Sequence, residues 1–297
     1  MPGRFLLLGS ASYDLLRNTA QSLAGRIVYQ ELGPFLLAEL PDADWSAHWF
    51  RGGFPQSWLA EEERYRQIWM GSFLTTYLEK DLPQLGLPAS PALVERLLTM
   101  LAYAQGGLAN FHSLARSLGV SAPTLSSYID FLERALFLRR LQPYFSNAAK
   151  RLVKSPKLYL RDSGVVHYLL RIPDVPRLLG HPAAGGSWEG YVIEQALAVL
   201  EPHERAYFYR TADGAELDLV IESALQIRAA LKIKLSSSPK LGRGASIALA
   251  DLGHPPLLVV TPAAADAPIR EGWVCSARTL PGHLRRLLRE APPHSTA

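Results

Sequence analysis

Two short segments place charged residues two positions apart in the alternating pattern of β-strands. Glu216 and Asp218 alternate with apolar residues, and Lys232 and Lys234 do the same in the segment that follows. Because successive side chains of a strand point to opposite faces, each pair shares one face of its strand. Carboxylates bind Mg²⁺, and a nearby lysine can help to activate water or stabilise the charge that develops on a phosphate. The two segments therefore predict metal-assisted phosphate chemistry or a relic of it.

A predicted helix at 188–200 precedes these strands and adds two carboxylates, Glu189 and Glu194. An acid on a helix, an acid on one strand and acid-x-lysine on the next is the arrangement of PD-(D/E)xK nucleases. The candidate catalytic groups are Glu189, Glu194, Asp218 and Lys234, and the candidate metal ligands are Asp218 and Glu216. Lys232 stands where the arrangement requires an acid, and its charge would repel a divalent cation. The sequence therefore favours an inactive form of this fold, kept for structure or binding.

A second feature is a run of cations without acids between two predicted strands, 138–144 and 157–160. Its members are Arg139, Arg140, Lys150, Arg151, Lys154 and Lys157. Two predicted helices, 111–118 and 122–136, precede these strands, and helix, turn, helix and hairpin form a winged helix-turn-helix. Such a wing can bind phosphates by releasing counterions. The alternative is a solvated hairpin whose lysines protect a strand edge.

The second helix of this pair has few groups that could read DNA bases. It offers Thr124, Ser126, Ser127 and Tyr128, but no arginine or lysine before Arg134. Winged helices also dock proteins, so the fold alone does not decide the partner. The sequence thus predicts binding that is nearly indifferent to nucleic-acid sequence, with DNA favoured, or docking of a protein.

Composition indicates a globular chain of two or three domains. It has 297 residues, of which 48% are hydrophobic and 20% charged, and a net charge of +4. A single cysteine, Cys275, excludes an intramolecular disulfide and a cysteine-rich zinc site, and it favours the cytoplasm. No apolar run reaches the length of about 18 residues that a membrane span needs, so no membrane partner is expected.

Several stretches together resemble a family of bacterial and archaeal AAA-type ATPases that carry a C-terminal domain of unknown function with a nuclease-like fold. The stretches are Arg4-Phe-Leu-Leu-Leu-Gly-Ser-Ala11, Ser22-Leu-Ala-Gly-Arg26, Arg51-Gly-Gly-Phe-Pro55, Tyr77-Leu-Glu-Lys-Asp81, Lys150-Arg-Leu-Val-Lys-Ser-Pro-Lys-Leu-Tyr159 and Glu216-Leu-Asp-Leu-Val220. The resemblance implies that Ser10 follows the sensor-1 strand near the γ-phosphate position, and that Arg26 is the arginine near the end of the ATPase core. It covers the C-terminal two-thirds of such a protein. The phosphate-binding Gly-x4-Gly-Lys-Ser/Thr does not occur in this sequence.

The expected fold is therefore α/β and α+β in several domains. Residues 1–44 are expected to be a remnant of the AAA core, 45–171 a helical region with the winged helix-turn-helix, 172–186 a Pro/Gly-rich linker, and 187–297 a nuclease-like α/β domain. The strands at 5–8 and 27–29 would lack the neighbour between them. We therefore expect the first 40 residues to be the least stable part and their sheet edge to favour self-association.

The leading functional hypothesis is a non-catalytic fragment or remnant that binds nucleic acid or a protein partner through the winged helix and its basic wing. One alternative is a Mg²⁺-dependent nuclease. Another is an ATPase, if the native protein supplies the missing P-loop. No cofactor is expected for this chain alone, and the resemblance implies ATP and Mg²⁺ only for a full-length family member.

Overall fold

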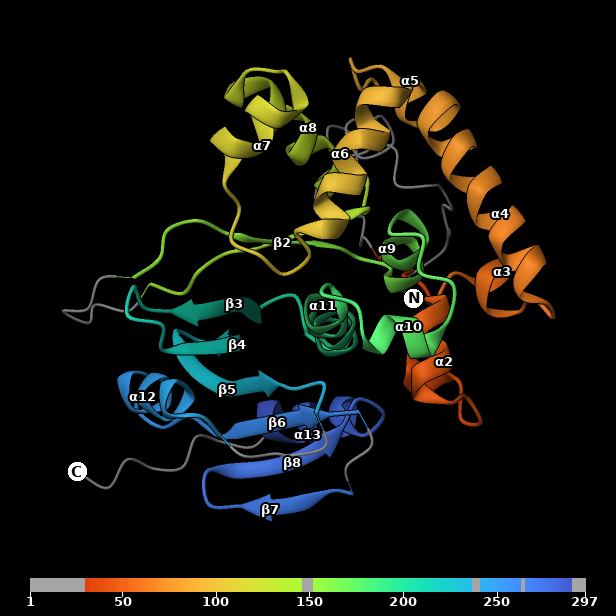
Figure 1. Cartoon of the computed structure of the whole chain (residues 1–297). Helices are drawn as coiled ribbons and strands as arrows, with labels where there is room; N and C mark the ends of the chain where they lie inside the picture. Colours follow the sequence, from red (N-terminus) through yellow and green to blue (C-terminus); the bar gives the residue numbers. More distant parts are fainter. Residues whose placement is uncertain (1–29, 146–151, 237–240, 263–264, 290–297) are drawn as a thin grey trace, which may run out of the picture.

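The computed structural model describes residues 30–145, 152–236, 241–262 and 265–289 (Figure 1). Helices dominate the first half of this chain, and a six-stranded sheet dominates the second half. The architecture is a mixed α/β fold with two sheets, one of two strands and one of six. Outside the described residues lie the predicted strands 5–8 and 27–29, Ser10, Arg26, Lys150 and Arg151.

Short helices fill the chain as far as residue 103, and their ends follow local capping signals. They are the 3-10 helix η1 (Leu37–Glu39), α2 (Trp45–Arg51), α3 (Pro55–Trp58), α4 (Glu63–Thr76), the π-helix η2 (Tyr77–Asp81), α5 (Leu82–Gln84) and α6 (Pro91–Tyr103). The Asp44 carboxylate caps α2 by accepting from the amides of Ser46 and Ala47. Ser90 caps α6 in the same way through Leu93 N. These side chains satisfy amides that the first turn of a helix leaves without partners.

The helix pair that the sequence predicts is present as α7 (Phe111–Leu118) and α8 (Ala122–Arg134). Gly119 ends α7 with a φ of +79°, a left-handed conformation that glycine adopts without strain. Ser121 Oγ then caps α8 by accepting from Thr124 N at 3.2 Å. A glycine stop followed two residues later by a serine cap thus fixes the tight turn between the helices.

The predicted hairpin follows as β1 (Leu138–Leu141) and β2 (Lys157–Leu160), which pair antiparallel. β1 ends earlier than the predicted strand 138–144, because the backbone beyond it pairs with another strand. Phe208 N donates to Gln142 O at 3.0 Å, and Tyr144 N donates to Phe208 O at 2.7 Å. The hairpin is therefore joined to the large sheet through its own backbone.

The stretch at 172–186 is structured, in contrast to the predicted linker. It contains α10 (Val175–Leu179), and α11 (Ala184–Leu197) begins within it, after α9 (Ser163–Leu169). Leu178 and Ala184 are buried in the same hydrophobic core as the helices on either side. The prolines and glycines here begin and end helices, because proline is tolerated in the first turn of a helix.

The large sheet has the strand order β3-β4-β5-β6-β8-β7. Its strands are β3 (Arg205–Arg210), β4 (Glu216–Ser223), β5 (Gln226–Ile233), β6 (Leu257–Thr261), β7 (Ala267–Ile269) and β8 (Gly272–Ser276). β3, β4 and β5 pair antiparallel, β5, β6 and β8 are parallel, and β7 is an antiparallel edge strand. The crossover between β5 and β6 contains α12 (Arg243–Asp251), and α13 (Leu280–Arg289) follows the last strand.

Helices cover both faces of this sheet, which makes three layers. Ala230 packs in one hydrophobic core with Ala248 of α12, whereas its neighbour Leu231 belongs to a second core with Ile193 of α11 and Leu284 of α13. Neighbouring residues of a strand face opposite sides, so these two cores lie on opposite faces. The second core continues without a break into the helices of the first half of the chain.

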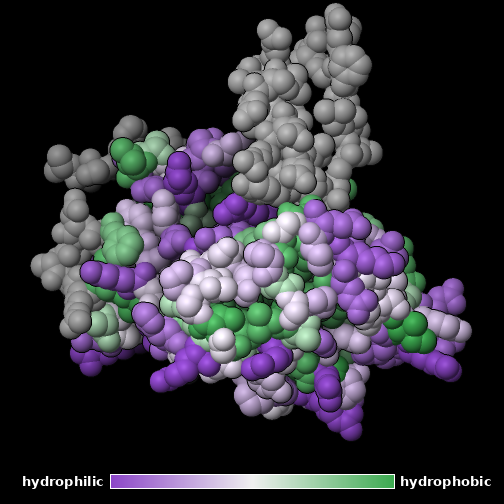
Figure 2. Space-filling model, turned by 90° about the horizontal axis from the view of Figure 1, so that it is seen from above, coloured by the Kyte–Doolittle hydropathy of each residue, from purple (hydrophilic) through white to green (hydrophobic). Residues whose placement is uncertain are grey.

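The surface seen from above mixes hydrophobic and hydrophilic residues, with hydrophobic side chains gathered in a central strip (Figure 2). Within the described parts of the chain, no helix combines the length and apolar character that a membrane span requires.

Candidate functional site

Side chains from four separate elements meet where β2, α11, β4 and β5 come together. We call this group the carboxylate–lysine cluster, and its members are Lys157, Tyr159, Glu189, Glu216, Asp218 and Lys232. The cluster includes three of the acids that the sequence indicates for phosphate chemistry. It also contains a lysine that the sequence assigned to the basic wing.

Asp218 is engaged through both of its carboxylate oxygens. Oδ1 accepts from Lys232 Nζ at 2.6 Å, and Oδ2 accepts from Ile233 N at 2.6 Å. The residue is only 2% exposed. The side chain that replaces the expected acid on β5 therefore forms an ion pair with the acid on β4.

Lys157 reaches from β2 to the acids of α11 and β4. Its Nζ lies 2.7 Å from Glu189 Oε1 and 2.6 Å from Glu216 Oε1. Burial alone would lower its pKa, but the charges of Glu189, Glu216 and Asp218 outweigh burial and raise that pKa above its ordinary value. Lys157 is thus a fully charged ammonium, although the residue is only 2% exposed.

Glu189 is held by two donors of β2. Tyr159 donates its hydroxyl to Glu189 Oε1 at 2.5 Å, the same oxygen that contacts Lys157. Burial, together with the nearby charge of Asp218, raises the pKa of Glu189 above its ordinary value in spite of Lys157. For Glu216 the balance is reversed: burial would raise its pKa, but Lys157, Lys232 and Arg210 lower it.

The charges of the cluster balance when its neighbour Arg210 is counted. Arg210 Nη1 lies 3.3 Å from Glu216 Oε2. The three carboxylates of Glu189, Glu216 and Asp218 then face three cations, Lys157, Lys232 and Arg210. Buried charges that are paired and hydrogen-bonded in this way are the arrangement that a protein interior tolerates.

The cluster does not fit the Mg²⁺ that a nuclease-like fold implies. Asp218 has both oxygens occupied, and Lys232 holds its charge at the place of the missing ligand. Among the residues that the structure describes, no group of three or more histidine, cysteine, aspartate or glutamate side chains is placed to hold a metal ion. Glu216 and Asp218, the two candidate ligands, each contact a lysine instead.

The other two candidate catalytic residues lie elsewhere. Glu194, five residues further along α11 than Glu189, accepts from Arg139 Nε at 2.7 Å and from Arg161 Nε at 2.9 Å. Lys234 follows the end of β5, where its carbonyl oxygen accepts from the indole of Trp188 at 3.1 Å. The structure therefore brings Glu189, Glu216 and Asp218 together and assigns Glu194 to a separate ion pair.

Several cations of the predicted basic wing form ion pairs with acids of the same chain. Arg139 binds Glu194, and Arg140 binds Asp130 and Glu133 of α8. Lys157 is buried in the carboxylate–lysine cluster and is thus not available to a phosphate group at the surface. Lys154 is exposed. The phosphate-contacting set that the sequence predicts is reduced to Lys150, Arg151 and Lys154, of which the first two lie outside the described residues.

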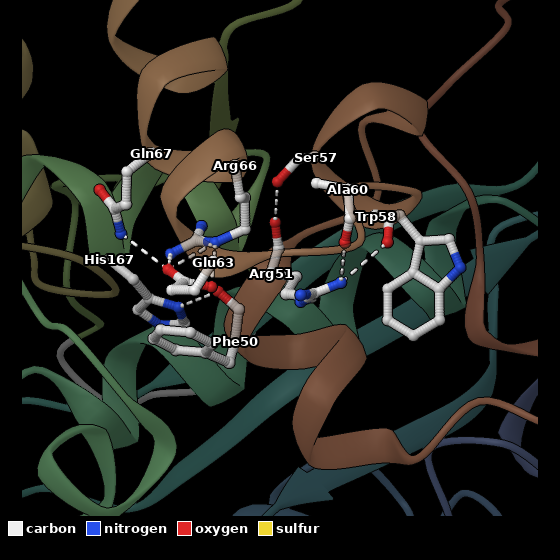
Figure 3. Close-up of polar contacts among 9 residues, drawn as sticks. All are labelled: Phe50, Arg51, Ser57, Trp58, Ala60, Glu63, Arg66, Gln67 and His167. Atoms are coloured by element: carbon white, nitrogen blue, oxygen red, sulfur yellow. Dashed lines mark hydrogen bonds and ion pairs between the residues drawn. The ribbon is translucent and has the colours of Figure 1, made fainter.

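A second polar network, which the sequence did not predict, joins α2, α3, α4 and α9 (Figure 3). Arg66 has an exposure of 0%, lies over the ring of Phe50 at 4.8 Å, and donates from Nε to both oxygens of Glu63 at 2.9 Å. His167 Nδ1 lies 2.9 Å from Phe50 O, and burial lowers the pKa of His167 to about 3. Arg51 Nη1 donates to the carbonyls of Trp58 and Ala60. These contacts fix helices to one another and present no exposed reactive group.

The sequence contains only an indirect signal for these contacts. The stretches around Arg51 and Tyr159 are among those that resemble the ATPase family, but their partners lie far away in the chain. Tyr159 binds a glutamate 30 residues later, and the buried histidine at 167 meets a carbonyl 117 residues earlier. Such pairs are set by tertiary packing and leave no local pattern.

Two regions of the chain match models of known protein families. Residues 42–175 match a family model described as "Domain of unknown function (DUF8612)", and residues 184–280 match "Domain of unknown function (DUF4143)". The chain is 42% identical over 262 residues to Uncharacterized protein Rv2008c of Mycobacterium tuberculosis and equally to Uncharacterized protein Mb2031c of Mycobacterium bovis. The match covers 88% of this chain and 59% of each relative. No solved structure matches significantly.

Proposed function

We propose that this chain is a non-catalytic binding part of an AAA-family ATPase, and that it contacts nucleic acid through the loop of the β1–β2 hairpin. The observation that carries the non-catalytic part is the ion pair between Lys232 and Asp218, because it occupies the carboxylate on which metal-assisted cleavage would depend. The relation to ATPases is supported by the match to DUF4143, a domain often associated with AAA ATPases.

The size of the relatives is consistent with this proposal. The chain spans 59% of the length of the curated relatives that it matches. ATP hydrolysis would need a P-loop, and a longer protein would have to supply it. ATP and Mg²⁺ therefore belong to the proposal only for a longer protein.

Contact with nucleic acid is supported by the arrangement of the helix pair and the hairpin. α7, α8, β1 and β2 follow one another as in a winged helix-turn-helix, and the sequence between the two strands contains Lys150, Arg151 and Lys154. In DNA-binding members of this class, the wing contacts phosphates. α8 has no cation before Arg134, so we propose binding to the phosphate backbone without base readout.

Salt-dependent binding tests this proposal. We would measure the affinity for a fluorescent duplex and for a single strand between 50 and 200 mM salt, by anisotropy, for the wild type and for K150A/R151A/K154A. The triple variant should bind more weakly and lower the slope of log K against log salt by about 3 for duplex DNA. The matched control R270A/R285A/R289A removes three exposed cations, one between β7 and β8 and two on α13, and should leave the affinity unchanged.

Two outcomes would redirect the functional assignment. Equal losses in the two triple variants would show that only net charge matters, and no salt-sensitive binding at all would favour a protein partner at α7 and α8. A nuclease is the other alternative, and Mg²⁺-dependent plasmid cleavage that disappears in Asp218→Ala would establish it. The pairing of Asp218 with Lys232 predicts that no such cleavage occurs.

A further inference from the structure

The ammonium group of Lys157 joins two acids that belong to different elements. Glu189 lies on α11 and Glu216 on β4, and their Oε1 atoms are 2.7 and 2.6 Å from Lys157 Nζ. The lysine itself comes from β2, in the hairpin that follows the helix pair. One cation therefore links a helix, the large sheet and the hairpin.

This bridging position is chemically similar to that of a divalent cation. Mg²⁺ and Mn²⁺ are held by oxygen ligands, often carboxylates contributed by separate elements. An ammonium group has three donors and can bind two carboxylates at once, although its N–O distances are longer than metal–oxygen distances. Lys157 meets the same electrostatic need by hydrogen bonding.

The second lysine completes the replacement on β5. Lys232 binds Asp218 Oδ1 at 2.6 Å, and its charge also lowers the pKa of Glu216. With Arg210 beside Glu216, each carboxylate of the cluster has a cationic partner. A divalent cation entering this site would have to displace these ammonium groups at a large electrostatic cost.

We propose that Lys157 and Lys232 hold the three carboxylates in place of a divalent cation, and that Lys157 thereby locks the β1–β2 hairpin onto the large sheet. This inference rests on the non-catalytic part of the proposed function and is independent of nucleic-acid binding. It assigns a structural task to acids that the sequence associates with cleavage. It also makes Lys232 the residue that excludes the metal.

Titration with Mn²⁺ alone tests the replacement. The wild type should bind no Mn²⁺ in the cluster by isothermal titration calorimetry. Lys232→Glu changes the cluster from three acids and three cations to four acids and two cations, and K157M/K232E leaves four acids and one cation. The double variant should bind one equivalent of Mn²⁺, and K232E alone should bind about tenfold more weakly because the ammonium of Lys157 remains.

The Mn²⁺ titration has its own control variant and its own contrary outcomes. K154E, at an exposed position of the same hairpin loop, changes the net charge equally and should create no site. Binding of Mn²⁺ by the wild type that is lost in Asp218→Asn would overturn the proposal even if the double variant did not fold. A folded double variant without Mn²⁺ binding would also overturn it.

Hydrogen exchange tests the lock. Lys157→Met keeps much of the side-chain volume and removes the ammonium, so amides of β1 and β2 should exchange at least about tenfold faster than in the wild type. K154M is the matched control and should leave those amides unchanged. Equal exchange in the wild type and K157M would show that the hairpin is held without the lysine. The proposed contact between the hairpin and nucleic acid would still stand, because it does not depend on this lysine.

Discussion

Asp162 accepts a hydrogen bond from Gly53 N through its Oδ2 at 2.8 Å, across 109 residues of sequence. Its Oδ1 accepts from Val165 N at 3.0 Å and so caps α9. Burial raises the pKa of this carboxyl above its ordinary value, although the amides of Gly53 and Val165 oppose the shift. One carboxylate therefore joins the turn after α2 to the start of α9, directly after β2.

Replacing Asp162 by asparagine should weaken this junction. An amide side chain has one acceptor and one donor group, so it leaves the buried amide of Gly53 or Val165 without a partner. We expect a loss of about 1–3 kcal/mol in the free energy of unfolding, measured with urea. Asp174→Asn is the control, because Asp174 caps α10 near the surface and asparagine is an equally good cap. Equal losses in the two variants would contradict the proposed role.

Gly52, which ends α2 directly before Gly53, should be equally sensitive to substitution. Gly52 has a φ of +76°, and a Cβ there would lie 2.3 Å from Asp162 Oδ1. Gly86 also has a positive φ, +95°, but no atom lies within 4 Å of its added Cβ. Gly86→Ala should therefore cost only the backbone strain of about 1–2 kcal/mol, whereas Gly52→Ala should cost about 1–3 kcal/mol more because of the clash. Thermal and urea unfolding of the two variants would reveal the difference.

The sequence predicts elements well where local signals suffice. Gly119 and Ser121 mark the turn between α7 and α8, and the structure confirms both their positions and the helices around them. The strands at 157–160 and 216–221 are also confirmed. These elements carry either a capping signal or a clear alternation of apolar residues, so they can be found without tertiary information.

Other elements and contacts depend on packing. α12 begins at Arg243, directly after Gly242, and the sheet supplies the apolar face against which its Ala248 and Leu249 pack. The basic run suggested exposed cations, but neither composition nor spacing shows that an acid lies beside a given lysine. The acids reach Lys157 only through tertiary packing, because Glu189 comes from α11 and Glu216 from β4.

Two buried histidines should make the fold sensitive to mild acid. Burial lowers the pKa of His48 to about 4 and that of His167 to about 3, from an ordinary value of 6.5. Their stabilising contribution is complete above pH 6.5 and falls as the pH decreases, because the unfolded chain then takes up protons that the folded chain does not. Between pH 6.5 and 5 we expect a loss of about 1–2 kcal/mol for each histidine.

Substitution can separate the histidines from other groups. The slope of the free energy of unfolding against pH should fall by about half in His167→Gln and remain unchanged in the exposed control His112→Gln. Slopes rather than absolute stabilities are compared, because the substitution at a buried site is itself destabilising. A slope that is the same in all three proteins would show that the histidines are not the cause.

The contribution of Glu194 to stability should persist to lower pH than that of the histidines and should then be lost as the pH falls, because Glu194 is a paired carboxylate. Burial would raise its pKa, but Arg139 and Arg161 outweigh burial and lower it below the ordinary value of 4.5. Its contribution is therefore present above about pH 4.5 and is lost as the pH falls through the folded-state pKa. Glu194→Gln removes the charge that pairs with two arginines, and we expect a loss of about 2–4 kcal/mol at pH 7, since Arg161 is only 10% exposed.

The pH dependence distinguishes this ion pair from simple packing. The difference in stability between the wild type and Glu194→Gln should shrink as the pH is lowered from 5 to 3, because the unfolded wild-type chain then takes up a proton at Glu194 that the folded chain, with its lowered pKa, binds less readily. Glu79→Gln, at an exposed position, should show no such convergence. A difference that stays constant over this range would mean that Glu194 acts through its shape and hydrogen bonds. In that case the charge of Glu194 would not stabilise the fold. Its ion pair with Arg139, which removes that arginine from the predicted phosphate contacts, would not stabilise the fold either.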